Sequence, residues 1–124
     1  MNPKIAVVED NPDNRMLVQA LLEDRYEISE YETGVEVVDG LGGNIPDLVL
    51  LDISLPEMDG TEVLAWIRSQ DELKDIPVIA LTAHAMAGDR DKYLAAGFND
   101  YVMKPIIDED VLIEAIERCL SATL

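Results

Sequence analysis

Short apolar runs separated by helical patterns dominate the chain. Four runs rich in branched residues each end in polar residues or a turn, and they cover residues 5–8, 48–51, 78–81 and 101–103. These runs do not alternate between apolar and polar positions, which indicates strands buried on both faces, as in a parallel sheet covered by helices. A weaker strand is predicted over residues 26–31.

The segments between these runs have a period near 3.6 and carry the boundary signals of helices. Asn11 followed by Pro12 predicts an N-cap with proline at the first helical position. In the helix that follows, we expect the apolar side chains of Leu17, Ala20 and Leu21 to face the core. This pattern predicts a helix between the first two strands.

Other helix boundaries are marked in the same way. Two pairs have capping-box spacing, Thr33 with Glu36 and Asp59 with Glu62, and Gly97 suits a helix C-terminus after Ala95 and Ala96. The last helix is predicted to start at Asp108 and to bury Leu112, Ile116, Cys119 and Leu120. The order is β-α repeated five times, which predicts a doubly wound α/β fold. Such sheets bind ligands beyond the carboxyl ends of their strands.

Length and charge narrow the possible functions. A chain of 124 residues is the usual size of one domain, so we expect residues 1–124 to form a single domain. The net charge of -17 disfavours binding to nucleic acid or to anionic lipid and favours metal cations and basic partners. The single cysteine, Cys119, is predicted to be core, and no apolar run approaches the ~20 residues of a membrane span. With no signal-peptide pattern, these features predict a cytoplasmic protein.

Polar residues with a shared chemistry follow the predicted strands. Glu9 and Asp10 follow the first strand, Asp52 the third, Thr82 the fourth and Lys104 the fifth. Three carboxylates close together repel one another, so a cation is expected among them, and Mg²⁺ prefers oxygen ligands and phosphate. The site then suits phosphoryl transfer to Asp52 as nucleophile, forming an acyl phosphate, with Lys104 adding positive charge and Thr82 bonding a phosphoryl oxygen.

At these positions the chain resembles the receiver (CheY-like) domain of bacterial two-component response regulators. The matching stretches are Val8-Glu9-Asp10-Asn11, Leu51-Asp52-Ile53 through Pro56 to Asp59-Gly60, Leu81-Thr82-Ala83 and Lys104-Pro105. Motif identity, order and spacing agree from Lys4 to about Leu120. The resemblance implies a flavodoxin-like sheet with strand order 2-1-3-4-5, five helices and Asp52 as the phosphorylation site.

The resemblance also implies a role for each site residue. Glu9, Asp10 and Asp52 would hold Mg²⁺ or Mn²⁺ together with the backbone carbonyl of Ser54. Lys104 would pair with the phosphoryl group, and Thr82 with Tyr101 would form the switch pair. Pro105 and Gly60 match the family's turn positions, and the Lys104-Pro105 peptide bond is often cis in this family. Ser54 and His84 resemble sites that tune how fast the phosphoryl group is lost to water.

The expected phosphodonor is a phosphohistidine on a histidine kinase or a phosphotransfer protein. The expected output is a downstream protein bound in trans, because no DNA-binding or enzymatic segment follows the receiver pattern. The pattern of Glu9-Asp10-Asn11 with Asn14-Arg15, and of Ala83-His84-Ala85-Met86, looks similar to receivers of hybrid sensor kinases and to single-domain regulators of phosphorelays. The alternative to a free-standing regulator is therefore a receiver fragment of a hybrid kinase.

Three other interpretations are an aspartyl-phosphate phosphatase, a flavin carrier and a docking module that is never phosphorylated. A phosphatase of this type usually needs a second aspartate close after the nucleophile, where this chain has Ile53 and Ser54. No hydroxyl-rich phosphate loop for a flavin follows the first strand, and the complete acidic set argues against a pure docking module.

Overall fold

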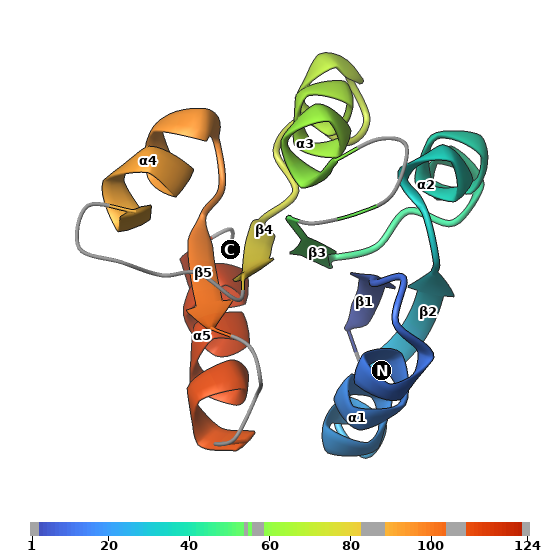
Figure 1. Cartoon of the computed structure of the whole chain (residues 1–124), viewed down its shortest axis with the longest axis vertical. Coiled ribbons are helices and arrows are strands. Elements are labelled where there is room, and N and C mark those ends of the chain that lie inside the picture. The colour runs from blue at the N-terminus through green and yellow to red at the C-terminus, as the bar shows by residue number, and fades with distance from the viewer. Residues whose placement is uncertain (1–2, 54, 56–58, 83–88, 104–108, 123–124) are drawn as a thin grey trace.

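The computed structural model describes residues 3–53, 55, 59–82, 89–103 and 109–122. Five parallel strands form one sheet in the order β2-β1-β3-β4-β5 (Figure 1). The strands are β1 (Lys4–Val8), β2 (Glu27–Tyr31), β3 (Leu48–Asp52), β4 (Val78–Thr82) and β5 (Asp100–Met103). Each predicted strand is present with bounds shifted by one residue, and the predicted doubly wound, flavodoxin-like order is confirmed.

Helices cover both faces of this sheet. They are α1 (Pro12–Leu22), α2 (Gly34–Gly40), α3 (Gly60–Ser69), α4 (Asp89–Ala96) and α5 (Glu109–Ala122), with a short 3-10 turn, η1 (Leu41–Gly43), that was not predicted. Figure 1 shows α1 and α5 on one face and α2, α3 and α4 on the other. Within the described residues, no helix combines the length and the apolar character needed to cross a bilayer.

Two apolar cores lie on opposite faces of the sheet. Alternate residues of the central strands enter different cores, so Val49 and Leu51 pack on the side of α2, α3 and α4, whereas Leu48 and Leu50 pack on the side of α1 and α5. Every residue of β3 and β4 is buried, which explains their unbroken apolar runs. The edge strand β2 instead exposes Glu27 and Glu30.

The predicted helix starts are confirmed by their hydrogen bonds. The Asn11 side chain accepts from the backbone amides of Asp13 and Asn14 at 2.8 and 3.2 Å. The two predicted caps also form, as the Thr33 hydroxyl accepts from the Glu36 amide at 3.1 Å and the Asp59 carboxylate from the Glu62 amide at 3.0 Å. Gly97 follows α4 with φ of 115°, a backbone conformation that glycine adopts without strain.

The predicted inner face of α1 is wrong. Its buried residues are Val18 and Leu22, whereas Leu17 and Ala20 are exposed and Leu21 packs only partly. The predicted buried set of α5 is largely confirmed: Leu112, Ile116 and Cys119 are buried and Leu120 is partly buried. The predicted start of that helix at Asp108 lies outside the described residues.

Arg68, near the end of α3, joins three segments of the chain. Its guanidinium donates to the carbonyl oxygens of Lys74 and Ile76 at 2.9 and 2.6 Å, and to the Gly97 carbonyl at 2.8 Å. It also donates to the Asn99 side chain at 2.8 Å, which in turn accepts from the backbone amide at the start of β4 at 2.9 Å. Partial burial lowers the pKa of Arg68 from its usual value. Arg68 thus fixes the turns before β4 and β5.

Candidate functional site

The candidate site lies at the carboxyl ends of β1, β3 and β4. In the observed strand order, successive strands are added on opposite sides of β1, and the gap between β1 and β3 is where doubly wound sheets bind ligands. Glu9 directly follows β1, Asp52 is the last residue of β3 and Thr82 is the last residue of β4. Strand pairing sets Asp52 opposite Leu81, one residue before Thr82. The sheet therefore brings together three strand ends that are far apart in sequence.

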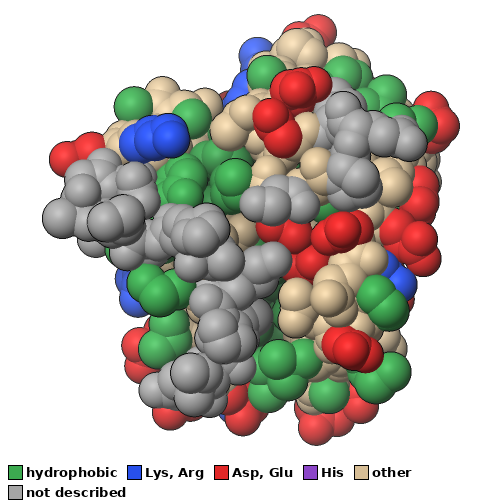
Figure 2. Space-filling view, in the orientation of Figure 1, with side chains coloured by type: hydrophobic (Ala, Val, Ile, Leu, Met, Phe, Trp, Pro, Cys, Tyr) green, Lys and Arg blue, Asp and Glu red, His purple; other side chains and the backbone are tan. Residues whose placement is uncertain are grey.

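Three carboxylates meet at this edge. One carboxylate oxygen each from Glu9, Asp10 and Asp52 lies within 4.8 Å of the other two. Glu9 and Asp52 are almost fully buried, at 1% and 2% exposed, while Asp10 is exposed. Figure 2 shows acidic side chains near the middle of this face. Buried like charges at this separation need a nearby cation, and an all-oxygen donor set fits a hard divalent ion such as Mg²⁺.

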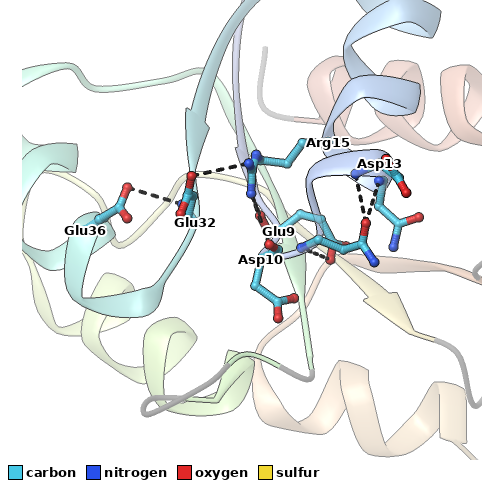
Figure 3. Close-up of polar contacts among 8 residues, drawn as sticks. Glu9, Asp10, Asp13, Arg15, Glu32 and Glu36 are labelled. Carbon is cyan, nitrogen blue, oxygen red and sulfur yellow. Dashed lines mark hydrogen bonds and ion pairs between the residues drawn. The ribbon is translucent and has the colours of Figure 1, made fainter.

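Arg15 holds the loop that carries Glu9 and Asp10. Its guanidinium donates to the backbone carbonyls of Glu9 and Asp10 at 2.8 and 3.2 Å, and it forms an ion pair with Glu32 at 3.3 Å. Figure 3 shows the Asp10 carboxylate directed away from this guanidinium. The Glu9 carboxylate itself accepts from the Asn11 backbone amide at 3.2 Å. Arg15 therefore orients the acidic loop through its backbone.

This role of Arg15 was not predicted. Arg15 lies one turn into α1, so it reaches back over the N-terminus of its own helix to the loop. The signal in the sequence is an arginine four residues after the N-cap Asn11, which by itself is common on helix surfaces. The half-buried state of Arg15 distinguishes it from such surface residues.

Gly60 lies directly against the backbone of Asp52. A Cβ atom at this position would be 2.5 Å from the Asp52 carbonyl oxygen and 2.7 Å from the Ile53 Cα. The Gly60 amide donates to the Ile53 carbonyl at 3.0 Å, and the Ile53 amide donates to the Leu81 carbonyl at 3.1 Å. The start of α3 thus closes on the end of β3, and only glycine allows this approach.

The hydroxyl of Thr82 contacts a residue that the sequence did not single out. Thr82 is buried, and its Oγ1 lies 3.0 Å from the hydroxyl oxygen of Tyr93 on α4. The Tyr93 ring packs edge-on against Phe98, with ring centroids 6.0 Å apart. It also meets the expected switch residue Tyr101 at 6.0 Å with the rings tilted by 46°. Thr82 and Tyr101 are therefore connected through Tyr93.

The structure brings together only part of the predicted site. Glu9, Asp10 and Asp52 form the acidic cluster. Thr82 is the last residue of β4, Gly60 is the first residue of α3, and Tyr101 lies within β5. The remaining predicted residues lie outside the described residues, and they are Ser54, His84, Lys104 and Pro105.

Comparison with known proteins agrees with this geometry. The family model of the response regulator receiver domain matches residues 5–117. The polar-differentiation response regulator DivK of Brucella anthropi is 43% identical over 107 residues, which cover 86% of this chain and 87% of DivK.

Solved structures are similar over nearly the whole chain. The receiver domain of the sensor histidine kinase PA1611 from Pseudomonas aeruginosa PAO1 is 34% identical with a TM-score of 0.87, covering 98% of this chain and 99% of that one. That structure has a magnesium ion coordinated in its active-site cleft. The chemotaxis protein CheY4 of Vibrio cholerae has a TM-score of 0.88 at 24% identity, covering 96% of this chain and 99% of its own, and this likeness concerns the fold alone.

Proposed function

The chain belongs to the response regulator receiver domain family, and from that premise we propose that Asp52 is its phosphoacceptor. The observation that carries this proposal is the position of Asp52 at the end of β3, with its carboxylate within 4.8 Å of those of Glu9 and Asp10. An acid in that position is both a candidate ligand of a cation and a candidate nucleophile. Family membership in a signalling class makes phosphoryl transfer the natural use of such a carboxylate.

We propose that Glu9, Asp10 and Asp52 hold Mg²⁺ or Mn²⁺, with the backbone carbonyl of Ser54 as a further ligand. The donor set is entirely oxygen, which suits either ion, and the PA1611 receiver domain has magnesium in its cleft. When bound, the ion neutralises charge on the carboxylates and on the transferring phosphoryl group. Lys104 would supply a second positive charge, and Gly60 keeps α3 close behind the acceptor.

The donor in this proposal is a phosphohistidine on a histidine kinase or a histidine phosphotransfer protein. An Asp52 carboxylate oxygen attacks phosphorus while the bond from phosphorus to the histidine nitrogen breaks. The electron pair of the broken bond returns to the imidazole nitrogen, and the ring takes up one proton from solvent, so the products are an acyl phosphate and a neutral histidine. The Thr82 hydroxyl then donates a hydrogen bond to a phosphoryl oxygen, and Tyr101 turns toward the space that Thr82 leaves.

The output in this proposal is a change in the binding of a partner protein. The strongly negative charge of -17 supports a protein partner over nucleic acid or a lipid surface. We propose that residues 1–124 form one receiver domain that works in the cytoplasm and catalyses only its own phosphorylation and dephosphorylation. Steady release of phosphate from a generic phosphate ester would instead indicate a phosphatase.

The test is phosphorylation of the purified chain by acetyl phosphate with Mg²⁺, followed by intact-mass measurement and peptide mapping. We expect one added phosphoryl group on Asp52 and none on Asp52→Asn. Asp13→Asn is the matched control, because Asp13 is a nearby exposed carboxylate on α1 outside the acidic cluster, and this variant should be labelled normally. Labelling of Asp52→Asn would reject the acceptor, and labelling after complete chelation of divalent ions would reject the metal.

A further inference from the structure

Two buried hydroxyl groups meet between β4 and α4. Thr82 and Tyr93 are 4% and 7% exposed, and their oxygens are 3.0 Å apart, so they share a hydrogen bond shielded from water. A threonine hydroxyl has a single proton to donate. Either hydroxyl can be the donor in this bond, so the bond keeps the Thr82 oxygen beside Tyr93 whichever proton forms it.

Asp52 and Thr82 lie on opposite sides of the sheet by the alternation of their strands. Asp52 follows Leu50 by two residues, and Leu50 packs in the core under α1 and α5. Thr82 follows Ala80 by two residues, and Ala80 packs with Tyr93 in the core under α2, α3 and α4. The Thr82 hydroxyl thus bonds on the α4 side, and it must turn to reach a phosphoryl group on Asp52.

The Tyr93 ring lies among other rings on the α4 side of the sheet. Its ring packs edge-on against Phe98, at an interplanar angle of 88°, and on Tyr101, with both centroid distances at 6.0 Å. Because Tyr93 belongs to α4, its hydroxyl stays on this side of the sheet when Tyr101 turns, unless α4 itself shifts. Movement of Thr82 toward Asp52 therefore stretches or breaks its bond to Tyr93.

We propose that Tyr93 is a positioning residue that retains the Thr82 hydroxyl in the unphosphorylated chain and competes for it with the phosphoryl group. This inference rests on the proposed phosphorylation of Asp52. Ionised phosphoryl oxygens only accept hydrogen bonds, so the Thr82 hydroxyl must point at them as the donor, and this rotation carries its oxygen away from Tyr93. Loss of this buried bond weakens the attachment of α4 to β4, which links the state of Asp52 to the position of a surface helix.

The test uses Tyr93→Phe, which removes the hydroxyl and keeps the ring. The measurement is the affinity for fluoroberyllate with Mg²⁺, since this ion mimics a phosphoryl group without the acyl phosphate bond. We expect Tyr93→Phe to bind fluoroberyllate about fivefold more tightly than the unaltered chain does. This factor corresponds to one neutral hydrogen bond, which no longer has to be broken when Thr82 turns. Tyr26→Phe is the matched control, because Tyr26 is also 7% exposed but packs in the opposite core, and its affinity should not change.

A double-mutant cycle separates positioning from a general effect on packing. In a Thr82→Val background, Tyr93→Phe should leave the affinity unchanged, because the hydroxyl it competes for is gone. Unchanged or weaker binding by Tyr93→Phe alone overturns the inference, and weaker binding would mean that Tyr93 supports Thr82 in the switched state.

A second measurement needs no substitution and keeps the inference open to refutation if Tyr93→Phe does not fold. The ring resonances of Tyr93 in the unaltered chain should shift when fluoroberyllate binds, while those of Tyr26 should not. A Tyr93 ring that does not respond overturns the inference. Labelling of Asp52 by acetyl phosphate keeps the two proposals apart, since a labelled chain with no effect of Tyr93→Phe refutes only the role of Tyr93, and an unlabelled chain refutes both.

Discussion

Replacing Gly60 with alanine tests how closely α3 supports the acceptor. The added Cβ would lie 2.5 Å from the Asp52 carbonyl oxygen and 2.7 Å from the Ile53 Cα. Comfortable contacts between such atoms are about 3.5 Å, so the two segments must separate by about 1 Å. Both atoms belong to the backbone, so no side chain can rotate away to relieve the contact.

The cost follows from this displacement. Overpacking of this kind costs about 1–3 kcal/mol, while the lower chain entropy of unfolded alanine returns about 0.4–1 kcal/mol. We therefore expect Gly60→Ala to lower the free energy of unfolding by about 1–2 kcal/mol. Because the displaced segment carries Asp52, phosphorylation should also slow by at least about tenfold, since a shift of 1 Å in a reacting group can cost about 100-fold.

The assays are urea denaturation and the rate of labelling by acetyl phosphate. Gly42→Ala is the matched control, because a Cβ at Gly42 meets no atom within 4 Å, and it should unfold and react as the unaltered chain does. If Gly60→Ala matches the unaltered chain in both the free energy of unfolding and the labelling rate, then the close contact between α3 and the acceptor affects neither stability nor phosphorylation.

Substitutions at three further positions test contacts that stabilise the fold. Arg68→Ala should lower the free energy of unfolding by about 2–4 kcal/mol, because it removes four hydrogen bonds from a charged donor. Arg68→Lys should restore less than half of this loss, and urea denaturation measures both variants. Asp59→Ala should cost about 1 kcal/mol through the lost N-cap, whereas Asp59→Asn keeps the acceptor for the Glu62 amide and should cost less. Hydrogen bonds lower the pKa of the Asp59 carboxyl from 3.8. The contribution of Asp59 to the free energy of unfolding is therefore present above that pH and is lost as pH falls through the lowered value, which urea denaturation at a series of acidic pH values measures. Burial raises the pKa of the Cys119 thiol above 9.0. The contribution of Cys119 to the free energy of unfolding is therefore present below that pH and is lost as pH rises through the raised value. Cys119→Ala should flatten this alkaline decline in stability, which a pH series of urea denaturation measures.

The strands and the acidic cluster were predictable because both depend on the sheet itself. A parallel strand covered on both faces favours apolar residues throughout, so β3 and β4 are almost continuous apolar runs in the sequence. Parallel strands also end at one edge, so residues that follow different strands must gather there. Order along the chain was therefore sufficient to place Glu9, Asp10 and Asp52 together.

The inner face of α1 was not predictable from apolar spacing. Leu17 and Val18 are adjacent, and either could begin a stripe at helical spacing. The buried stripe is the one that contains Val18, and Arg15 lies three residues before Val18 on the same face, where it is held against the acidic loop. A half-buried arginine on the inner face breaks the apolar pattern by which such faces are recognised.

Tyr93 was missed for a related reason. Helix α4 contributes few apolar residues and has no sequence motif, so nothing marks one of its side chains as part of a site. The partner of Tyr93 is a hydroxyl on a strand eleven residues earlier, and only the packing of α4 on β4 brings the two together. A contact that depends on how a helix docks leaves no spacing rule in the sequence.

The charged outer strand β2 has a consequence for the behaviour of the chain at high concentration. The outermost strand of a sheet presents unpaired amides and carbonyls, and these can template the growth of fibrils when the strand is flat and apolar. Here Glu27 and Glu30 are exposed along that strand, on a molecule whose net charge is -17. Strand-to-strand stacking of copies would bring these carboxylates together, so the repulsion between them guards the chain against amyloid-like assembly.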